Sequence, residues 1–352
     1  MILMNDFKAE PAALREAMAA AAARVFASGW YILGQELKAF EETWARVCGT
    51  AHCVGVGNGL DAIELALRAL DIGPGDEVIT TPMTAVATVL AIVRAGAHPV
   101  LADIDPGTAL LSPDSVRRCI GPRTRAVLLV HLYGQVRDMD AWTALTAENG
   151  LQLIEDCAQS HLACWRGAVA GSFGVAGAYS FYPTKNLGGI GDGGAVVTDD
   201  DDLAALLREL RNHARGADYD HPHVTGNSRL SEVEAAALRV GLRRLAADNA
   251  RRREVAAAYR AAAPDLAWHP EHPRHVYHLC VARLADREAY RAGRPFDTAI
   301  HYARALTQQS GYSGFVRDAC PEAEAWAAET VSFPCFPEIT DDEIEAVCRG
   351  LL

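Results

Sequence analysis

The sequence lacks the marks of a secreted protein and of a membrane protein. None of its nine cysteines forms a CxxC pair, and residues 1–7 carry no basic lead of an export signal. The cysteines are therefore expected to be reduced thiols. Apolar runs such as residues 126–130 are far too short to cross a bilayer. These absences predict a cytoplasmic protein with no membrane partner.

The sequence also has fewer basic than acidic residues, 33 against 45. The formal net charge is −12 and the pI is about 5.5, which disfavours broad contact with nucleic acid or with an anionic membrane. The rest of the composition is ordinary for a globular protein, with 50% hydrophobic and 22% charged residues. A chain of 352 residues is long enough for one large domain and a smaller one.

Short β-rich runs alternate with helical segments through the N-terminal half. The runs lie at 53–56, 78–81, 99–103, 126–131, 151–154, 178–182 and 194–198. Between them apolar residues recur at helical spacing, as at Leu60, Ile63 and Leu67. The alternation predicts an α/β domain with a largely parallel sheet. The last two runs leave no room for a crossover helix, so we expect seven strands with one reversed.

A change of composition marks the end of the predicted large domain. Residues 229–263 are rich in Ala, Leu, Glu and Arg, which favours one long helix or two abutting ones. Prolines at 264, 270 and 273 then interrupt the pattern. The units expected are a large α/β domain at 1–263 and a small α+β domain at 264–352, the latter with a strand at 277–282 and a helix after Asp341.

Two candidate site segments follow predicted strands. Asn58 and Gly59 form a turn at the start of a helix, where free N–H groups suit a phosphate, although the pair would also serve any tight turn. Glu155 and Asp156 end an apolar strand. A carboxylate there can hold a cationic ring nitrogen, or it can act as a helix N-cap. Ligands collect at the carboxyl ends of strands in such sheets.

The third segment, SFYPTKNLGGIGDGGAVVT, places Lys185 in an apolar stretch and follows it with five glycines. Burial lowers the pKa of a lysine and makes it a nucleophile towards carbonyl groups. Glycines let the backbone turn closely around a bound group. The alternative is a surface lysine that ends a strand. Phosphate site, acidic strand end, Ser180 and Lys185 occur in the order that a pyridoxal phosphate enzyme needs.

Matches at family spacing extend over nearly the whole chain. They comprise SGWYILG at 28–34, GNGLDAIELALRALDIGPGDEVIT at 57–80, VHLYGQVRDMDA at 130–141, IEDCAQSH at 154–161, the Lys185 segment, GNSRLSEVEAA at 226–236, IHY at 300–302 and SFPCFPEITDDEIEAV at 332–347. On these segments the chain resembles the DegT/StrS family of sugar aminotransferases. The resemblance implies the fold-type-I architecture of pyridoxal phosphate transferases, with a large seven-stranded domain and a small α+β domain.

The resemblance also implies a role for each matched position. Lys185 would bond to the cofactor and move protons, Asp156 would pair with the pyridine nitrogen, and Gln159 would lie against the ring. The phosphate would be bound by Asn58, Gly59, Leu60 and Ser180, and by the partner subunit's Asn227, so a homodimer with shared active sites is expected. The N-terminal segment 1–35 would border the substrate cleft.

The sequence departs from the family pattern at several places. Ala85 stands where the family has an aromatic residue stacked on the ring, and Leu60 replaces a threonine of the phosphate turn. The usual HYP becomes His301-Tyr302-Ala303, at the sugar end of the site. His301 and Tyr302 are substrate candidates there, with Trp30 and Tyr31, for which a place in the core is the alternative.

The activity implied is transfer of an amino group from an amino acid, L-glutamate by family analogy, to a keto sugar. Pyridoxal 5′-phosphate would carry the group as pyridoxamine 5′-phosphate, and the acceptor nearest in pattern is a dTDP-linked 3-keto-6-deoxyhexose. A cyclitol ketone is a second candidate acceptor. Two different functions are also compatible with this fold: a sugar dehydratase, which has histidine in place of Lys185, and a catalytically silent sensor. The presence of Lys185 argues against the dehydratase.

Four histidines, at 269, 272, 275 and 278, recur every third residue. The spacing invites a metal site, but Pro270 and Pro273 forbid a regular helix that would put the rings on one face. In an extended segment the rings would point in different directions. We expect no metal site.

Overall fold

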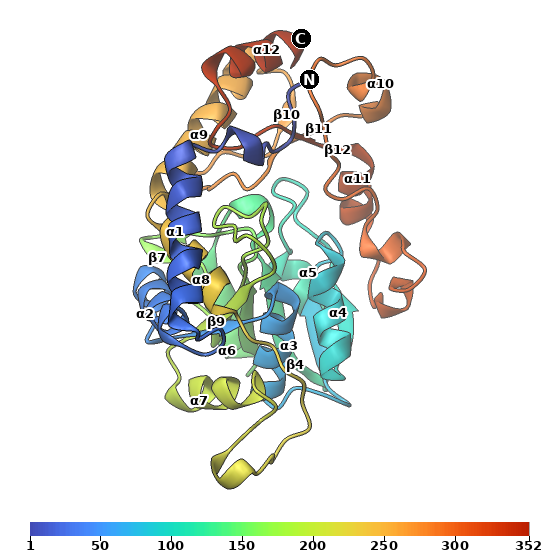
Figure 1. Ribbon diagram of the computed structural model, residues 1–352. Helices are drawn as coiled ribbons and strands as arrows, with labels where there is room; N and C mark the ends of the chain where they lie inside the picture. The colour runs from blue at the N-terminus through green and yellow to red at the C-terminus, as the bar shows by residue number, and fades with distance from the viewer. Residues whose placement is uncertain (352) are drawn as a thin grey trace.

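The computed structural model describes residues 1–351, which fold around one seven-stranded sheet (Figure 1). Its strands are β1 (His52–Val56), β2 (Glu77–Thr80), β3 (His98–Leu101), β4 (Thr124–Val130), β5 (Gln152–Asp156), β8 (Ala176–Ser180) and β9 (Gly194–Thr198). The order across the sheet is β1-β9-β8-β5-β4-β2-β3. Only β9 runs antiparallel to its neighbours β1 and β8. The prediction of an α/β domain with seven strands, one of them reversed, is confirmed.

Helices cover both faces of this sheet because its strands are apolar on both faces. Along β4, Ala126 and Leu128 pack into one layer, whereas Val127 and Leu129 pack into the other. The first layer holds α3 (Gly59–Ala69), α4 (Val86–Ala95) and α7 (Asp201–Leu210). The second holds α2 (Gln35–Cys48), α5 (Pro113–Cys119), α6 (Met139–Glu148) and α8 (Glu232–Leu242). The carboxyl ends of the parallel strands are thus left for the loops that carry the site.

Two further helices connect the large sheet to the C-terminal part of the chain. Helix α1 (Ala12–Ser28) packs on α8 through Ala21, Val25 and Ala236. Helix α9 (Leu245–Ala262) follows α8 after a break at Arg243 and Arg244, so the segment predicted as one or two helices forms two. In Figure 1 both α1 and α9 lie along one side of the molecule, and the upper end of α9 reaches the C-terminal unit.

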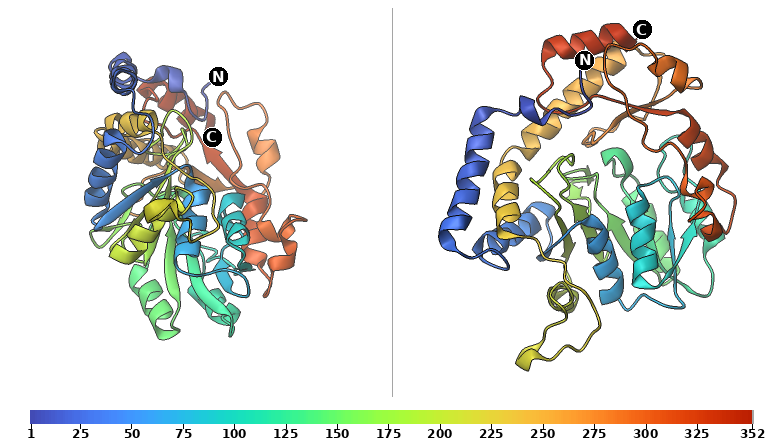
Figure 2. Two further views of the ribbon diagram at one scale, coloured as in Figure 1. Left: turned by 60° about the horizontal axis from the view of Figure 1, so that its bottom comes forward. Right: turned by 45° about the vertical axis from the view of Figure 1, so that its right-hand side comes forward.

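The C-terminal unit lies over one end of the sheet (Figure 2, right). Its antiparallel strands are β10 (Ala267–Trp268), β11 (Cys280–Arg283) and β12 (Thr330–Phe333), and its helices are α10 (Arg287–Arg291), α11 (Pro321–Glu329) and α12 (Asp341–Leu351). Val255 and Tyr259 of α9 pack into the core of this unit with Phe333 and Val347. The division of the chain at residue 263 stays a prediction, since α9 belongs to both cores.

The strand expected at 277–282 was placed too early. Tyr277 has a φ of 42°, which is outside the extended region, and β11 begins only at Cys280. The remaining short elements are the pair β6 (Cys164–Trp165) and β7 (Ala168–Val169), and single 3₁₀ turns at Phe7–Ala9, Leu132–Gly134, Ala217–Tyr219, Leu306–Gln308 and Ser313–Phe315. Within residues 1–351, no helix is long and apolar enough to cross a membrane.

Candidate active site

The site residues of the large domain converge where two strands end beside the start of a helix. Asp156 is the last residue of β5, Ser180 is the last residue of β8, and Asn58 caps α3. Lys185 lies in the loop that follows β8. The carboxyl edge of an α/β sheet is where ligands bind, because helix N-termini and loops meet there.

The start of α3 offers free hydrogen-bond donors. Asn58 Oδ1 accepts the N–H of Asp61 at 2.8 Å, whereas the N–H groups of Gly59 and Leu60 have no acceptor within residues 1–351. A Cβ atom on Gly59 would lie 2.6 Å from Ser180 Cβ, so glycine is what allows this helix to approach β8 so closely. Two free amides, a hydroxyl and the helix dipole together suit a phosphate.

Asp156 is buried and its orientation is fixed by two donors. Its Oδ2 accepts the Thr88 hydroxyl at 2.8 Å, and its Oδ1 accepts the N–H of Ala158 at 3.1 Å. The Thr88 hydroxyl also lies 2.8 Å from that of Thr84. Thr88 lies in the first turn of α4, and Thr84 lies two residues before that helix begins. A buried carboxylate whose orientation is fixed in this way can pair with a cationic ring nitrogen.

Gln159 connects the segment after β5 to the C-terminal unit. Its Oε1 accepts the N–H of Tyr133 at 2.7 Å, and its Nε2 donates to the Tyr302 hydroxyl at 3.2 Å. Burial raises the pKa of Tyr302 to about 12, partly offset by the bond from Gln159, so this phenol is neutral. His301 is held through Nδ1 by the Ser332 hydroxyl at 2.8 Å. The structure therefore brings Tyr302 into contact with Gln159, and the His301 ring lies beside that of Tyr302, 5.8 Å away between centroids.

Lys185 is half-buried, close enough to Asp156 and His301 for their charges to interact. Burial lowers the pKa of its ammonium group to about 8, although the Asp156 carboxylate acts in the opposite direction. With this pKa, roughly a tenth of the Lys185 side chains are uncharged amines at pH 7, far more than for an ordinary lysine. An amine of this kind can attack a carbonyl carbon and can accept a proton.

Two of the departures from the family pattern, Ala85 and Leu60, lie at the starts of helices α4 and α3. Ala85 is the half-buried residue that precedes α4, and its small side chain provides no ring for stacking. Leu60 is half-buried in the first turn of α3, where it contributes an N–H but no hydroxyl. A stacked aromatic pair is worth about 1 kcal/mol beyond burial. A flat ligand bound here therefore lacks that contribution from position 85.

Three candidates lie on the surface of the single chain. Trp30 and Tyr31 are 63% and 51% exposed, so the hypothesis that they belong to the core is wrong. The indole N–H of Trp30 donates to the carbonyl of Ile32 at 2.7 Å, and its backbone N–H donates to the Ser28 hydroxyl at 3.1 Å. Asn227 is exposed as well, and it is bridged to Asn212 through the backbone. Each of the three side chains is therefore accessible from solvent.

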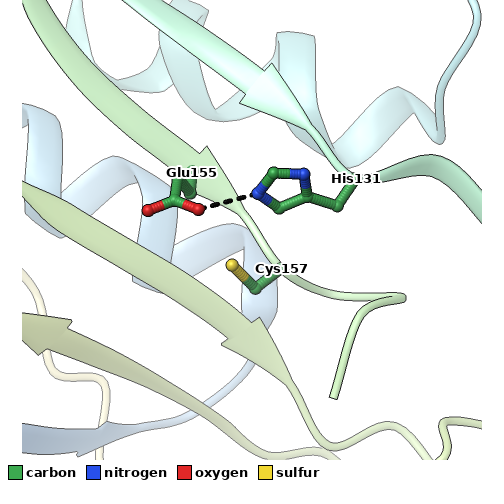
Figure 3. Close-up of side chains that lie close together, drawn as sticks. All are labelled: His131, Glu155 and Cys157. Carbon is green, nitrogen blue, oxygen red and sulfur yellow. Dashed lines mark hydrogen bonds and ion pairs between the residues drawn. The ribbon is translucent and has the colours of Figure 1, made fainter. Parts of the chain in front are cut away.

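Figure 3 shows the one group of three potential metal ligands that the structure brings together within residues 1–351: His131, Glu155 and Cys157. Glu155 Oε2 accepts from His131 Nε2 at 2.7 Å, and its two oxygens also accept the N–H groups of Gly171, Phe173 and Gly174. Burial raises the pKa of the Cys157 thiol, which keeps it neutral. Four donors already satisfy the carboxylate, so we interpret the group as a structural support of β5.

The four spaced histidines do not form one cluster, although two of them are neighbours. His269 and His275 are buried 5.2 Å apart, centroid to centroid, His272 stacks on Trp165, and His278 contacts Asn186. Sequence reasoning missed Thr88 and His278 as neighbours of the site residues. The signal for Thr88 was its place in the segment TAVAT, residues 84–88, which leads into α4, whereas the regular spacing that includes His278 suggested a metal site and not a contact with the lysine loop.

Comparison with known proteins gives one consistent result. The model of the DegT/DnrJ/EryC1/StrS aminotransferase family matches residues 12–352. The chain is 43% identical over 344 residues to the dTDP-3-amino-3,4,6-trideoxy-alpha-D-glucose transaminase of Streptomyces venezuelae, covering 95% of this chain and 91% of the relative. It is 42% identical to the dTDP-3-amino-3,6-dideoxy-alpha-D-galactopyranose transaminase of Aneurinibacillus thermoaerophilus, covering 93% of this chain and 92% of the relative.

A solved structure agrees with this assignment. The crystal structure of S. venezuelae DesV in complex with a ketimine intermediate superposes with a TM-score of 0.96 at 41% identity, over 99% of this chain and 97% of that chain. The predicted fold class and the resemblance stated from the motifs are both confirmed. The chain belongs to the DegT/DnrJ/EryC1/StrS aminotransferase family and has the fold of its enzymes.

Proposed function

We propose that this enzyme transfers an amino group from L-glutamate to the keto group of a dTDP-linked deoxysugar, with pyridoxal 5′-phosphate as cofactor. The observation that carries the proposal is the convergence of Lys185, Asp156 and the free N–H groups of α3 on one edge of the sheet. The two relatives named above act on dTDP-linked 3-amino sugars by their names, which favours this acceptor class. The cytoplasmic location stays a prediction.

The residues present fit this cofactor. Its phosphate would accept from the N–H groups of Gly59 and Leu60 and from the Ser180 hydroxyl, beside the cap residue Asn58. Its ring nitrogen would face the Asp156 carboxylate, which Thr88 holds in place. Gln159 and Ala85 would lie next to the ring. When bound, the cofactor withdraws electrons from the carbon that bears the amino group, so that carbon can lose a proton.

The remaining tasks belong to the protein. Lys185 Nζ would accept the proton from the donor carbon and return a proton during transfer. Its lowered pKa, about 8, provides the uncharged amine that this step needs. His301 and Tyr302 would contact the sugar from the C-terminal unit. Burial, and then the charge of Lys185, lowers the pKa of His301 to about 4, so it would contact the sugar as a neutral ring.

The active form in this proposal is a homodimer. Phe26, Trp30, Tyr31 and Ile32 expose apolar surface next to one another in the sequence, and Phe26 and Tyr31 lie 6.5 Å apart. Exposed apolar residues that gather in this way are typical of an interface. The partner subunit's Asn227 would complete the phosphate site. The N-terminal segment 1–35 would border the substrate cleft.

The substrate assignment is tested by amino transfer from ¹⁵N-labelled L-glutamate. We expect ¹⁵N in the sugar product when the acceptor is a dTDP-linked 3-keto-6-deoxyhexose, and little or none with a cyclitol ketone such as an inosose. Mass spectrometry of the nucleotide product reads the result. Transfer to the cyclitol ketone alone would refute the nucleotide-sugar acceptor while retaining the reaction.

A further inference from the structure

The residue after the candidate lysine makes a set of buried hydrogen bonds. Asn186 Nδ2 donates to Asn249 Oδ1 at 2.7 Å and to the carbonyl of Val276 at 2.9 Å. Asn186 Oδ1 lies 3.2 Å from His278 Nδ1. Asn249 in turn donates through Nδ2 to the carbonyl of His161 at 2.9 Å. Because these side chains are buried, each bond replaces one that water would otherwise make.

Two backbone carbonyls determine which atom donates and which accepts in every hydrogen bond of this set. A carbonyl oxygen only accepts, so Val276 requires the Nδ2 end of Asn186, and His161 requires the Nδ2 end of Asn249. Asn186 Oδ1 therefore faces His278 as an acceptor. His278 Nδ1 must then carry the proton and donate it. The ring has a single tautomer, with Nδ1 protonated.

His278 is held neutral by what surrounds it. Burial lowers its pKa well below the ordinary value, and the charged or titratable groups that face it, Lys185, Arg252, His301 and His161, act in the same direction. A proton on Nε2 is therefore disfavoured. The donor bond from Nδ1 to Asn186 accordingly persists over the working pH range.

The bonds join three parts of the molecule at the lysine loop. Asn249 belongs to α9, while Val276 and His278 precede β11 in the C-terminal unit. His161 follows the strand that ends with Asp156. The amide of Asn186 is therefore fixed to the segment after Asp156, through Asn249, and to the C-terminal unit, through His278. A loop anchored on both sides presents its side chains in one arrangement.

We propose that His278 is a positioning residue for Lys185, which acts through Asn186 to hold the lysine loop against the C-terminal unit. The inference rests on the proposed function, in which Lys185 is the reacting group. Without the donor at position 278, Asn186 loses a buried partner and the loop admits water around Lys185. Displacement of a reacting group by about 1 Å can cost on the order of a hundredfold in rate.

The test compares two substitutions at His278. His278→Leu keeps an apolar volume but removes the donor, while His278→Asn provides an N–H donor near the position of Nδ1. His275→Leu is the control, because His275 is buried in the same segment and bonds to the N–H of Tyr277, not to Asn186. Thermal unfolding identifies any variant that does not fold.

The first readout needs no cofactor. The chain has only three lysines, Lys8, Lys38 and Lys185, so acetylation of each can be followed by mass spectrometry across the pH range. In the unmodified protein we expect the labelling midpoint of Lys185 at a pH of about 8. In His278→Leu it should rise towards the ordinary lysine value of about 10.4. His278→Asn and the control should keep the original midpoint.

The second readout is the rate of amino transfer in the holoenzyme. His278→Leu should lower kcat by about tenfold to a hundredfold, with KM for L-glutamate changed by less than about threefold, and His278→Asn should restore most of kcat. An unchanged midpoint and kcat in a folded His278→Leu, or an equal loss in His275→Leu, would overturn the inference. If the unmodified holoenzyme transfers no amino group, the proposed function fails, while the labelling result still decides the positioning role.

Discussion

Lys185→Ala is expected to abolish amino transfer while leaving the fold intact. In the proposed mechanism the substitution removes both the amine that would bond to the cofactor and the group that would move the proton, so we expect kcat to fall by roughly 10⁴-fold or more. Removal of a half-buried ammonium group from a desolvating site does not cost stability. Steady-state rates with L-glutamate and the keto sugar, and thermal unfolding, measure the two effects.

The matched control is Lys38→Ala. Lys38 lies on the exposed side of α2, where its nearest acidic group, Glu42, is 4.0 Å away. An exposed pair at this distance contributes little to stability, so the variant should keep the rate of the unmodified enzyme. If the Lys185 variant turned over at a similar rate, the role of Lys185 would be refuted.

Asp156→Asn is expected to cause the second large loss. The amide keeps the shape of the side chain and its bond to the Ala158 N–H, but it removes the charge that would keep the ring nitrogen protonated. Loss of one aimed electrostatic partner in an active site costs roughly 10² to 10³-fold in kcat. The visible absorption of the cofactor and the rate of amino transfer should both change.

Thr88→Val separates the charge of Asp156 from its orientation. It removes the 2.8 Å hydrogen bond to Oδ2 but leaves the carboxylate in place. A hydrogen bond to a charged group contributes about 1.5–3 kcal/mol, which corresponds to a loss of about tenfold to a hundredfold. An Asp156→Asn variant that was no more impaired than Thr88→Val would argue that the charge itself is not required.

The sheet was predictable because its signals are local. Each strand is a short apolar run, and the spacing between Ser180 and Gly194 alone predicts that β8 and β9 are antiparallel. The C-terminal unit was less predictable. The residue type of Tyr277 favours a strand, but its φ is positive, so β11 begins only after it. Such a conformation is determined by tertiary contacts, which a short stretch of sequence does not contain.

The candidate site also has a part that was predictable from local sequence and a part that was not. Lys185, Asp156 and Asn58 each follow or precede a strong local pattern, so the sequence identifies them. Contacts between distant segments do not: Gln159 and Tyr302 are 143 positions apart, and Asn186 and His278 are 92 apart. The exposure of Trp30 was also not predictable, since an aromatic residue is more often buried.

The most direct test of the central claim is the visible absorption of the protein with pyridoxal 5′-phosphate, before and after L-glutamate. We predict a yellow Schiff-base band that depends on Lys185 and that bleaches when L-glutamate converts the cofactor to its pyridoxamine form. A protein that gives no such band at saturating cofactor would contradict the account. It would then favour a catalytically silent member of the family, in which Ala85 and Leu60 have weakened the cofactor site.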